Sequence, residues 1–386
     1  MRGGEFLPSL NNMNKYITQI FIGIIILSGT FCSGFAYDQF DFKNENGRFY
    51  VAQLSFFILS IGCLGSLLIY RYNKWVSYLG IALSFGVFKT FLLANAPKVN
   101  MFESTIIGLC AFIAYYAIRN FRLKEDILKW FIIPAAFNII VVLIQYFDHY
   151  PLFFLYVKGV SGLIGNEGMS AAYLALTLPI FFKYFRWGIL PCAVAIVVCG
   201  GSVGIVAGVI GLLFYLYKTD RKRFMFYSAA MAVILLLLVC VPKSQSVKEE
   251  LHLRAAMVVG TLDGIKHNPV LGWGVGSFIP VVSQIPPEES EFLGIKLNTQ
   301  AAIMNHPHNE LLSGWWKIGI AFPIIIMVML VKFLRSCKIE AITSFAVVLV
   351  GIVISMGWFF TLPSFFLLIT AFAVYENTIE EDTDDS

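Results

Sequence analysis

The sequence has few charged residues, because Asp, Glu, Lys and Arg together make up 13% of its 386 residues. Ordinary soluble domains carry about 25%, whereas this chain is 58% hydrophobic and has a mean hydropathy of +0.76. A soluble enzyme can bury a few apolar strands, but the run from Phe224 to Val241 approaches the length of a bilayer span. The composition therefore excludes an ordinary soluble enzyme and predicts one transmembrane domain over residues 1–386.

Other common signals are also missing. The seven cysteines have neither metal-ligand nor disulfide spacing, so they are interpreted as small core residues. No repeat of 20 to 50 residues and no similarity between the two halves is evident, which weighs against a transporter built from inverted repeats. The net charge is only +4, and in a membrane protein the positions of the charges indicate orientation. No nucleic-acid partner is expected.

Apolar runs of about 17 to 25 residues match the hydrocarbon thickness of a bilayer. The stretch 187–217 is too long for one straight span, and its break at Gly200-Gly201-Ser202 predicts two short helices that meet at a turn. With these two, the sequence predicts an all-α polytopic protein of about 12 transmembrane helices. The other predicted spans are 16–37, 49–70, 75–95, 101–119, 127–147, 169–185, 224–241, 309–332, 340–358 and 362–375.

The basic residues are unevenly distributed between the links that join these spans. Fifteen of the 28 Lys and Arg residues fall in five short links near residues 71–74, 119–129, 183–186, 218–223 and 332–338. The positive-inside rule assigns these links, and both termini with them, to the cytoplasm. The long loop 242–308 then lies outside the cytoplasm. The acidic tail 376–386 is predicted to be solvated and disordered.

The loop 242–308 contains features that a simple connector does not need. An amphipathic helix is predicted at its start, with Arg254 and Thr261 on the polar face, and it is expected to rest on the membrane surface. The apolar face of this helix comprises Leu251, Ala255, Val258, Leu262 and Ile265. Asn268-Pro269 ends the helix, and a glycine-rich stretch, 272–276, follows. This stretch lacks the strand-turn-helix context of a nucleotide-binding loop, so a phosphate loop is rejected.

The loop closes with Asn305-His306-Pro307-His308-Asn309-Glu310, directly before an apolar run. Asn309 is a good N-cap for the following helix, so His308 is expected at a helix N-terminus. The dipole there disfavours imidazolium and keeps His308 a neutral base near pH 7. The alternative is a capping and packing cluster in which neither histidine handles a proton. No nearby third ligand is evident for a metal held by His306 and His308, so no metal site is predicted.

These residues carry a family resemblance. His308-Asn309, followed after nine residues by Gly319, resembles the signature of the O-antigen ligases. Gly165-Asn166-Glu167 leading into a span is similar to the glycine-asparagine start of a middle span in that superfamily. Arg254 followed by Asn268-Pro269-Val270-Leu271-Gly272 is similar to its arginine helix and proline-leucine-glycine turn. The resemblance covers residues 160–335 in the family's order.

The chain departs from the family pattern at two places. Where family members often have serine-arginine-glycine, this chain has Ser202-Val203-Gly204, so the expected arginine is missing. After Gly319, the ligase pattern continues with a glycine and a threonine, but Phe322 and Pro323 stand there. The first departure puts the diphosphate contacts in doubt, and the second weakens the choice of ligase over polymerase.

The resemblance implies a GT-C-like fold in the bacterial inner membrane and an active site that faces the periplasm. The implied reaction transfers a glycan from undecaprenyl diphosphate to a hydroxyl of a glycan or lipid A-core acceptor, with inversion and without a metal or other cofactor. His308 would be the general base. Arg254 would hold the diphosphate, with Lys89 and Lys317 as substitutes for the missing arginine. His306, Asn309, Gly319 and Asn166 would support the site.

Three alternatives remain open. A repeat-unit polymerase and a protein O-oligosaccharyltransferase belong to the same superfamily. The alternative from another class is a transporter or flippase for a lipid-linked or anionic solute, with Lys89 as its intramembrane charge. The sugar and the acceptor are not determined by these residues.

Overall fold

The computed structural model describes residues 18–20, 22–23, 71–92, 111–147, 160–164, 166–225, 228, 245–275, 291–292, 295–296, 309–357 and 362–384. Within these ranges, only the backbone is described at 87–92, 245–254, 256, 291–292, 295–296, 362 and 381–384.

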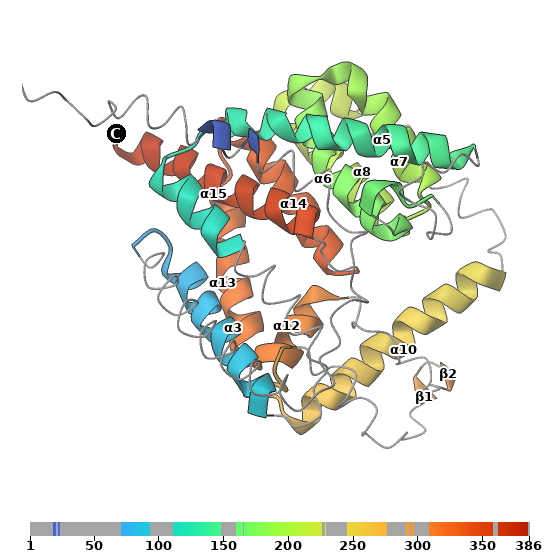
Figure 1. Cartoon of the computed structure of the whole chain (residues 1–386), viewed down its shortest axis with the longest axis vertical. Coiled ribbons are helices and arrows are strands. Elements are labelled where there is room, and N and C mark those ends of the chain that lie inside the picture. Colours follow the sequence, from blue (N-terminus) through green and yellow to red (C-terminus); the bar gives the residue numbers. More distant parts are fainter. Residues whose placement is uncertain are drawn as a thin grey trace, which may run out of the picture.

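The described residues are mostly helical (Figure 1), so the all-α prediction is confirmed. The α-helices are α3 (Lys74–Leu92), α5 (Ile132–Tyr146), α6 (Glu167–Tyr184), α7 (Ile189–Val198), α8 (Ser202–Thr219), α10 (Gln245–His267), α12 (Glu310–Ile318), α13 (Ala321–Arg335), α14 (Ile342–Ser355) and α15 (Leu362–Asp384). Three 3-10 helices join them: η2 (Glu125–Phe131), which runs into α5, η4 (Gly162–Ile164) and η5 (Arg186–Gly188). A hairpin of β1 (Glu291–Phe292) and β2 (Ile295–Lys296) pairs Glu291 with Lys296.

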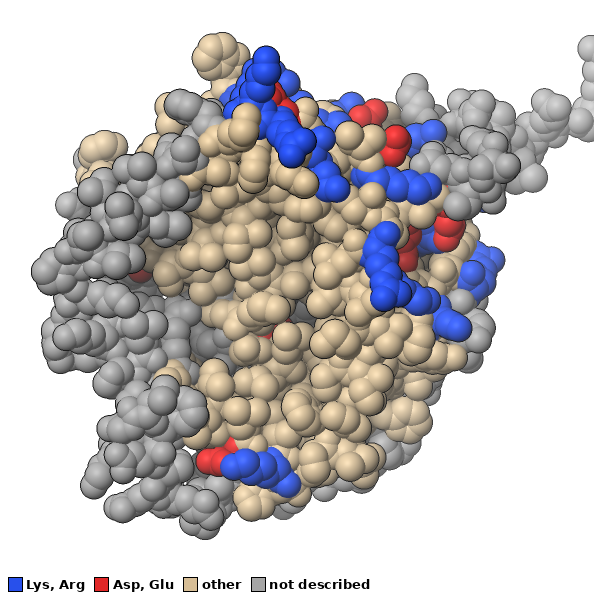
Figure 2. All heavy atoms as spheres, turned by 180° about the vertical axis from the view of Figure 1, so that it is seen from behind, with Lys and Arg blue, Asp and Glu red and all other residues tan. Residues whose placement is uncertain are grey.

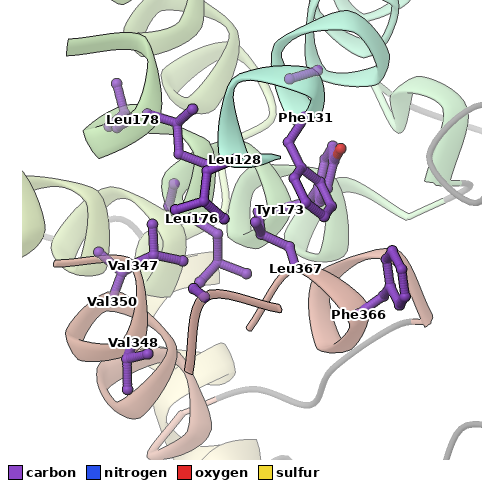
Figure 3. Close-up of a cluster of buried hydrophobic side chains, with 14 of the residues drawn as sticks. Leu128, Phe131, Tyr173, Leu176, Leu178, Val347, Val348, Val350, Phe366 and Leu367 are labelled. Carbon is purple, nitrogen blue, oxygen red and sulfur yellow. The ribbon is translucent and has the colours of Figure 1, made fainter. Parts of the chain in front are cut away.

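Helix α6 is the centre of the main core, and an unbroken run from Ser170 to Phe182 is buried. Figure 3 shows side chains of η2, α6, α14 and α15 in this core, including Leu128, Leu176, Val347 and Leu367. Helix α8 packs closely on α6 through small residues. A Cβ at Gly204 would lie 2.7 Å from the carbonyl carbon of Ala171, so the two backbones approach as small-residue interfaces between membrane helices do.

Two of the described helical segments are long and apolar enough to cross a membrane, Glu125–Tyr146 and Ser202–Thr219. Arg186–Val198 and Ile342–Ser355 are shorter apolar helices. The predicted pair of helices within 187–217 is confirmed, because α7 ends at Val198 and α8 begins at Ser202. The count of about 12 transmembrane helices stays a prediction.

The predicted single span 309–332 is wrong in one respect, because the helix is broken at Gly319. Gly319 has φ +76° and ψ −163°, a conformation that essentially only glycine adopts. The backbone of the loop after α10 lies against this break, and the Ile320 N–H donates to the Val270 carbonyl (3.3 Å). The apolar run is therefore divided between the short α12 and the longer α13.

The acidic tail was predicted to be disordered, but α15 continues as a helix to Asp384. The tail is helical because it packs against Arg119, whose side chain is buried on the helix that precedes η2. Its guanidinium forms ion pairs with Glu376 and Glu380, and it donates to Asn377 (2.7 Å). A buried guanidinium needs such partners. The prediction of disorder is therefore wrong for residues 376–384.

The predicted faces of α10 also need correction. Thr261 was placed on the polar face, but it is fully buried and its hydroxyl donates to the Met257 carbonyl (2.6 Å). Leu262, placed on the apolar face, is 38% exposed. The buried line is Met257, Thr261 and Ile265, because a hydroxyl that bonds to its own helix can pack among apolar groups.

Candidate active site

The N-termini of α6, α8 and α12 lie close to the C-terminal end of α14. The Asn309 side-chain amide at the start of α12 donates to the carbonyl of Met356, which follows α14 (2.9 Å). A Cβ at the next residue, Gly357, would lie 2.9 Å from Val203 at the start of α8. A Cβ at Gly201 would in turn lie 2.6 Å from the Ala171 side chain in the first turns of α6. These contacts thus join residues that are up to 154 positions apart in the sequence.

Two of these three N-termini are capped by side chains. The Asn309 side-chain oxygen accepts from Leu312 N (3.0 Å), which confirms its predicted N-cap role. Asn166 caps α6 in the same way by accepting from Met169 N (3.2 Å), and its side chain is exposed. Helix α8 instead begins after Gly201 and receives no side-chain cap. An uncapped helix N-terminus is able to attract an anion, and Val203 lies in this first turn.

The turn after α10 docks on the C-terminal end of α12. The N–H groups of Trp273 and Gly274 donate to the carbonyls of Trp316 (2.6 Å) and Lys317 (3.0 Å). The Trp315 indole donates to the Pro269 carbonyl (2.9 Å). A Cβ at Gly272, where φ is +65°, would lie 2.5 Å from the Trp316 carbonyl oxygen, so this turn requires glycine. The proline-leucine-glycine segment and Gly319, which are about 50 residues apart, are thus adjacent.

Helix α3 contacts the same place (Figure 1). The Val275 N–H donates to the Gly86 carbonyl (3.1 Å), and Gly86 lies against Ile318 of α12. Lys89 is three residues further along α3, but its side chain lies outside those that the structure describes. Lys317 is half-buried, and no described carboxylate pairs with it.

The predicted catalytic residues are only partly placed. His306 and His308 lie outside the described residues, immediately before Asn309. Arg254 is on α10 with only its backbone described, about 16 Å along the helix axis from Ile265, the residue that contacts α12. Asn166, Asn309 and Gly319 are placed as described above. The structure thus places Asn166, Asn309 and Gly319, and it does not describe the side chains of His306, His308 and Arg254.

The ends of the helices that carry the predicted cytoplasmic links also meet one another. Arg71 donates to Asn120 (2.8 Å), Lys183 pairs with Glu125, and the Lys332 ammonium lies 5.7 Å from the Trp75 ring centroid. In Figure 2, Lys and Arg gather at the top and right of the visible face, its broad middle has almost none, and a further basic group lies beside an acidic one at the bottom. The described links that were predicted to be cytoplasmic thus lie away from the end where α6, α8 and α12 begin.

Sequence reasoning missed Glu376, which joins this network of basic residues. Its carboxylate accepts from Tyr115 and Asn73, and burial raises the pKa of the carboxyl group against the opposing effects of Tyr115 and Arg119. The available sequence signal was Arg119 at the end of an apolar run, because an arginine that becomes buried needs a partner.

Neither comparison with known proteins identifies a relative. No protein-family model matches the sequence, and no curated protein matches it significantly. Within the described ranges, no group of three or more His, Cys, Asp or Glu residues is placed to hold a metal ion.

Proposed function

We propose that this chain is a polytopic glycosyltransferase of the bacterial inner membrane, of the O-antigen ligase and polymerase type. The proposed reaction transfers a glycan from undecaprenyl diphosphate to an acceptor hydroxyl at the periplasmic face. One observation carries the proposal. The turn after α10 docks on the end of α12, and the start of α12 is linked through Met356 and Gly357 to the start of α8, although these segments are far apart in the sequence.

Residence in a membrane is supported by apolar side chains exposed in the isolated chain. Only 44% of the apolar window in Glu125–Tyr146 and 33% of that in Ser202–Thr219 is buried, whereas the core helix of a soluble protein would be mostly buried. The exposed side chains follow single helix faces, which water disfavours and lipid accepts. They are Phe137, Ile140 and Ile144 on α5, Val206 and Ile210 on α8, and Ile324, Met327, Val331 and Leu334 on α13.

The proposed orientation rests on the two ends of the molecule. The basic links and their ion pairs share one end, as expected of cytoplasmic loops. The start of α12, which follows the two histidines, lies at the end where α8 begins without a side-chain cap. The proposed active site therefore faces the periplasm, and both termini are cytoplasmic.

The proposed chemistry is a single displacement that inverts the sugar. His308 accepts the proton of the acceptor hydroxyl as it attacks the anomeric carbon. The departing diphosphate needs positive charge, for which Arg254 is the leading candidate and Lys89 or Lys317 a substitute. The uncapped N-terminus of α8 adds a partial positive charge where the family arginine is missing. No metal or other cofactor is needed for these steps.

The test is transfer by purified protein from a lipid-linked oligosaccharide. His308→Ala is expected to reduce transfer by about 10²- to 10⁴-fold, the usual cost of a lost general base. His306→Ala, two residues away in the same segment, is the matched control and should lose far less. Both variants should insert into the membrane normally. Small and equal losses in the two variants would contradict a catalytic role for His308 and favour the packing cluster.

A second assay separates the classes of protein. In liposomes, a flippase would move the labelled lipid-linked donor and leave it intact, whereas the proposed enzyme consumes it. The glycan profile of a deletion strain then separates ligase from polymerase. Loss of a ligase leaves long chains on undecaprenyl diphosphate, and loss of a polymerase leaves acceptors that carry one repeat unit.

A further inference from the structure

A basic recess lies at the cytoplasmic end, between the helix that ends at Asn120 and η2. It has a volume of about 300 Å³, which is at the small end for a ligand site. Arg122, Lys124 and Lys129 line it together with a single carboxylate, Asp126. Thr18 and the half-buried Trp130 also contribute to the walls. The proposed transfer reaction uses none of these residues.

The walls of this recess are held by the core. Leu123 and Ile127, which also line it, are buried in the main hydrophobic cluster. The Asn377 side-chain amide donates to the carbonyls of Ile118 and Leu123 (both 3.0 Å) and so secures the turn between them. Arg122 sits in that turn with φ +49°, a value that a non-glycine residue holds only when its surroundings enforce it. The walls of the recess are therefore held in place by packing and hydrogen bonds.

Two of its cations are not neutralised by the described part of the protein. Arg122 and Lys129 are exposed, and no described carboxylate forms an ion pair with either. Their neighbours differ, because Arg119 and Lys183 are each paired with Glu side chains. Asp126 accepts a hydrogen bond from the Tyr184 hydroxyl (3.4 Å). The recess thus retains positive charge that a phosphate can neutralise.

The position of the recess favours a lipid phosphate over a free one. Trp130 lies where the basic link meets the apolar helix, and exposed apolar side chains such as Phe137 follow on α5. Tryptophan prefers the headgroup level of a bilayer, and basic pockets between membrane helices suit anionic headgroups. We propose that this recess binds the phosphate of an anionic phospholipid headgroup in the cytoplasmic leaflet. This proposal rests on membrane residence, but it is independent of the transfer reaction.

The size of the effect follows from the charges. Each Lys or Arg near an anionic surface contributes about fivefold in affinity, so losing both cations should weaken binding roughly 25-fold. Phosphatidylcholine carries no net charge, so it should bind much more weakly than phosphatidylglycerol.

The test uses the full chain, purified in neutral detergent, with binding followed by titration of short-chain phosphatidylglycerol, phosphatidylcholine or inorganic phosphate. The variant Arg122→Gln/Lys129→Gln removes the two cations. The control Arg221→Gln/Lys222→Gln removes two exposed charges from another cytoplasmic link. We expect the first variant to lose phosphatidylglycerol binding and the control to keep it. The variant Arg122→Lys/Lys129→Arg retains both charges and should bind, which shows that a loss reflects charge and not folding.

Two results would overturn the proposal. Equal losses in both double Gln variants would mean that the whole basic end attracts anionic lipid without a specific site. Competition by inorganic phosphate at the same concentration as the lipid would mean that the ligand is a soluble anion. Transfer assayed in neutral lipid is expected to be unchanged in Arg122→Gln/Lys129→Gln, so failure of this proposal and failure of the proposed enzyme activity are distinguishable.

Discussion

Replacement of Gly319 by alanine should disrupt the docking of the loop after α10 on helix α12. The backbone of Gly319 has φ +76° and ψ −163°, and holding another residue there costs about 1–3 kcal/mol. The new Cβ would also overlap the Val270 carbonyl and lie 2.8 Å from Leu271 N, so the loop after α10 must move away. That movement breaks up to three backbone hydrogen bonds around the turn, each worth about 0.5–1.5 kcal/mol. If all three bonds are lost, the expected total is roughly 2.5–7.5 kcal/mol.

Two other glycines provide matched controls. Gly200 has φ +70° with nothing within 4 Å of its would-be Cβ, so Gly200→Ala measures backbone strain alone, about 1–2 kcal/mol. Gly260 lies inside α10, also with open space around it, and Gly260→Ala should stabilise the helix by up to about 1 kcal/mol. Thermal unfolding of the detergent-solubilised variants gives the ranking. If Gly319→Ala were no less stable than Gly200→Ala, the docking of the loop on α12 would be refuted.

The remaining predictions concern both ends of the molecule. Asn309→Ala should cost about 1–2 kcal/mol in thermal unfolding, because it removes the cap of α12 and the hydrogen bond to Met356, while Asn309→Asp should retain the cap and lose only the hydrogen bond; an Asn309→Asp variant as stable as the unchanged protein would argue against the link to α14. Arg119→Ala should cost about 3–5 kcal/mol, because it leaves Glu376 buried without its cation, and adding Glu376→Gln should recover part of the loss; a double variant no better than the single one would contradict this. Cysteine labelling should find positions 222 and 335 in the cytoplasm and position 290 outside it, and labelling of 290 from inside would contradict the proposed site.

Local signals were sufficient for part of the fold. The break between α7 and α8 was predicted from three adjacent small residues, and the cap of α12 from Asn309 before an apolar run. Both depend on residues within one helical turn, where the chain's own propensity decides the structure. The all-α class followed in the same way from apolar runs that are too long for strands.

Contacts between distant segments decided the rest. The apolar run after Asn309 contains Gly319 and Pro323, a local signal that the predicted single span did not use. The docking of residues about 50 positions earlier places the division at Gly319. Thr261 is buried because of its neighbours and not because of its own polarity. The acidic end is helical because Arg119, more than 250 residues away, is buried beside it. The sequence alone determined the all-α class and where the candidate motifs lie. Only the tertiary structure decided which helix ends meet, because that depends on burying charges and small-residue faces against partners that no local pattern specifies.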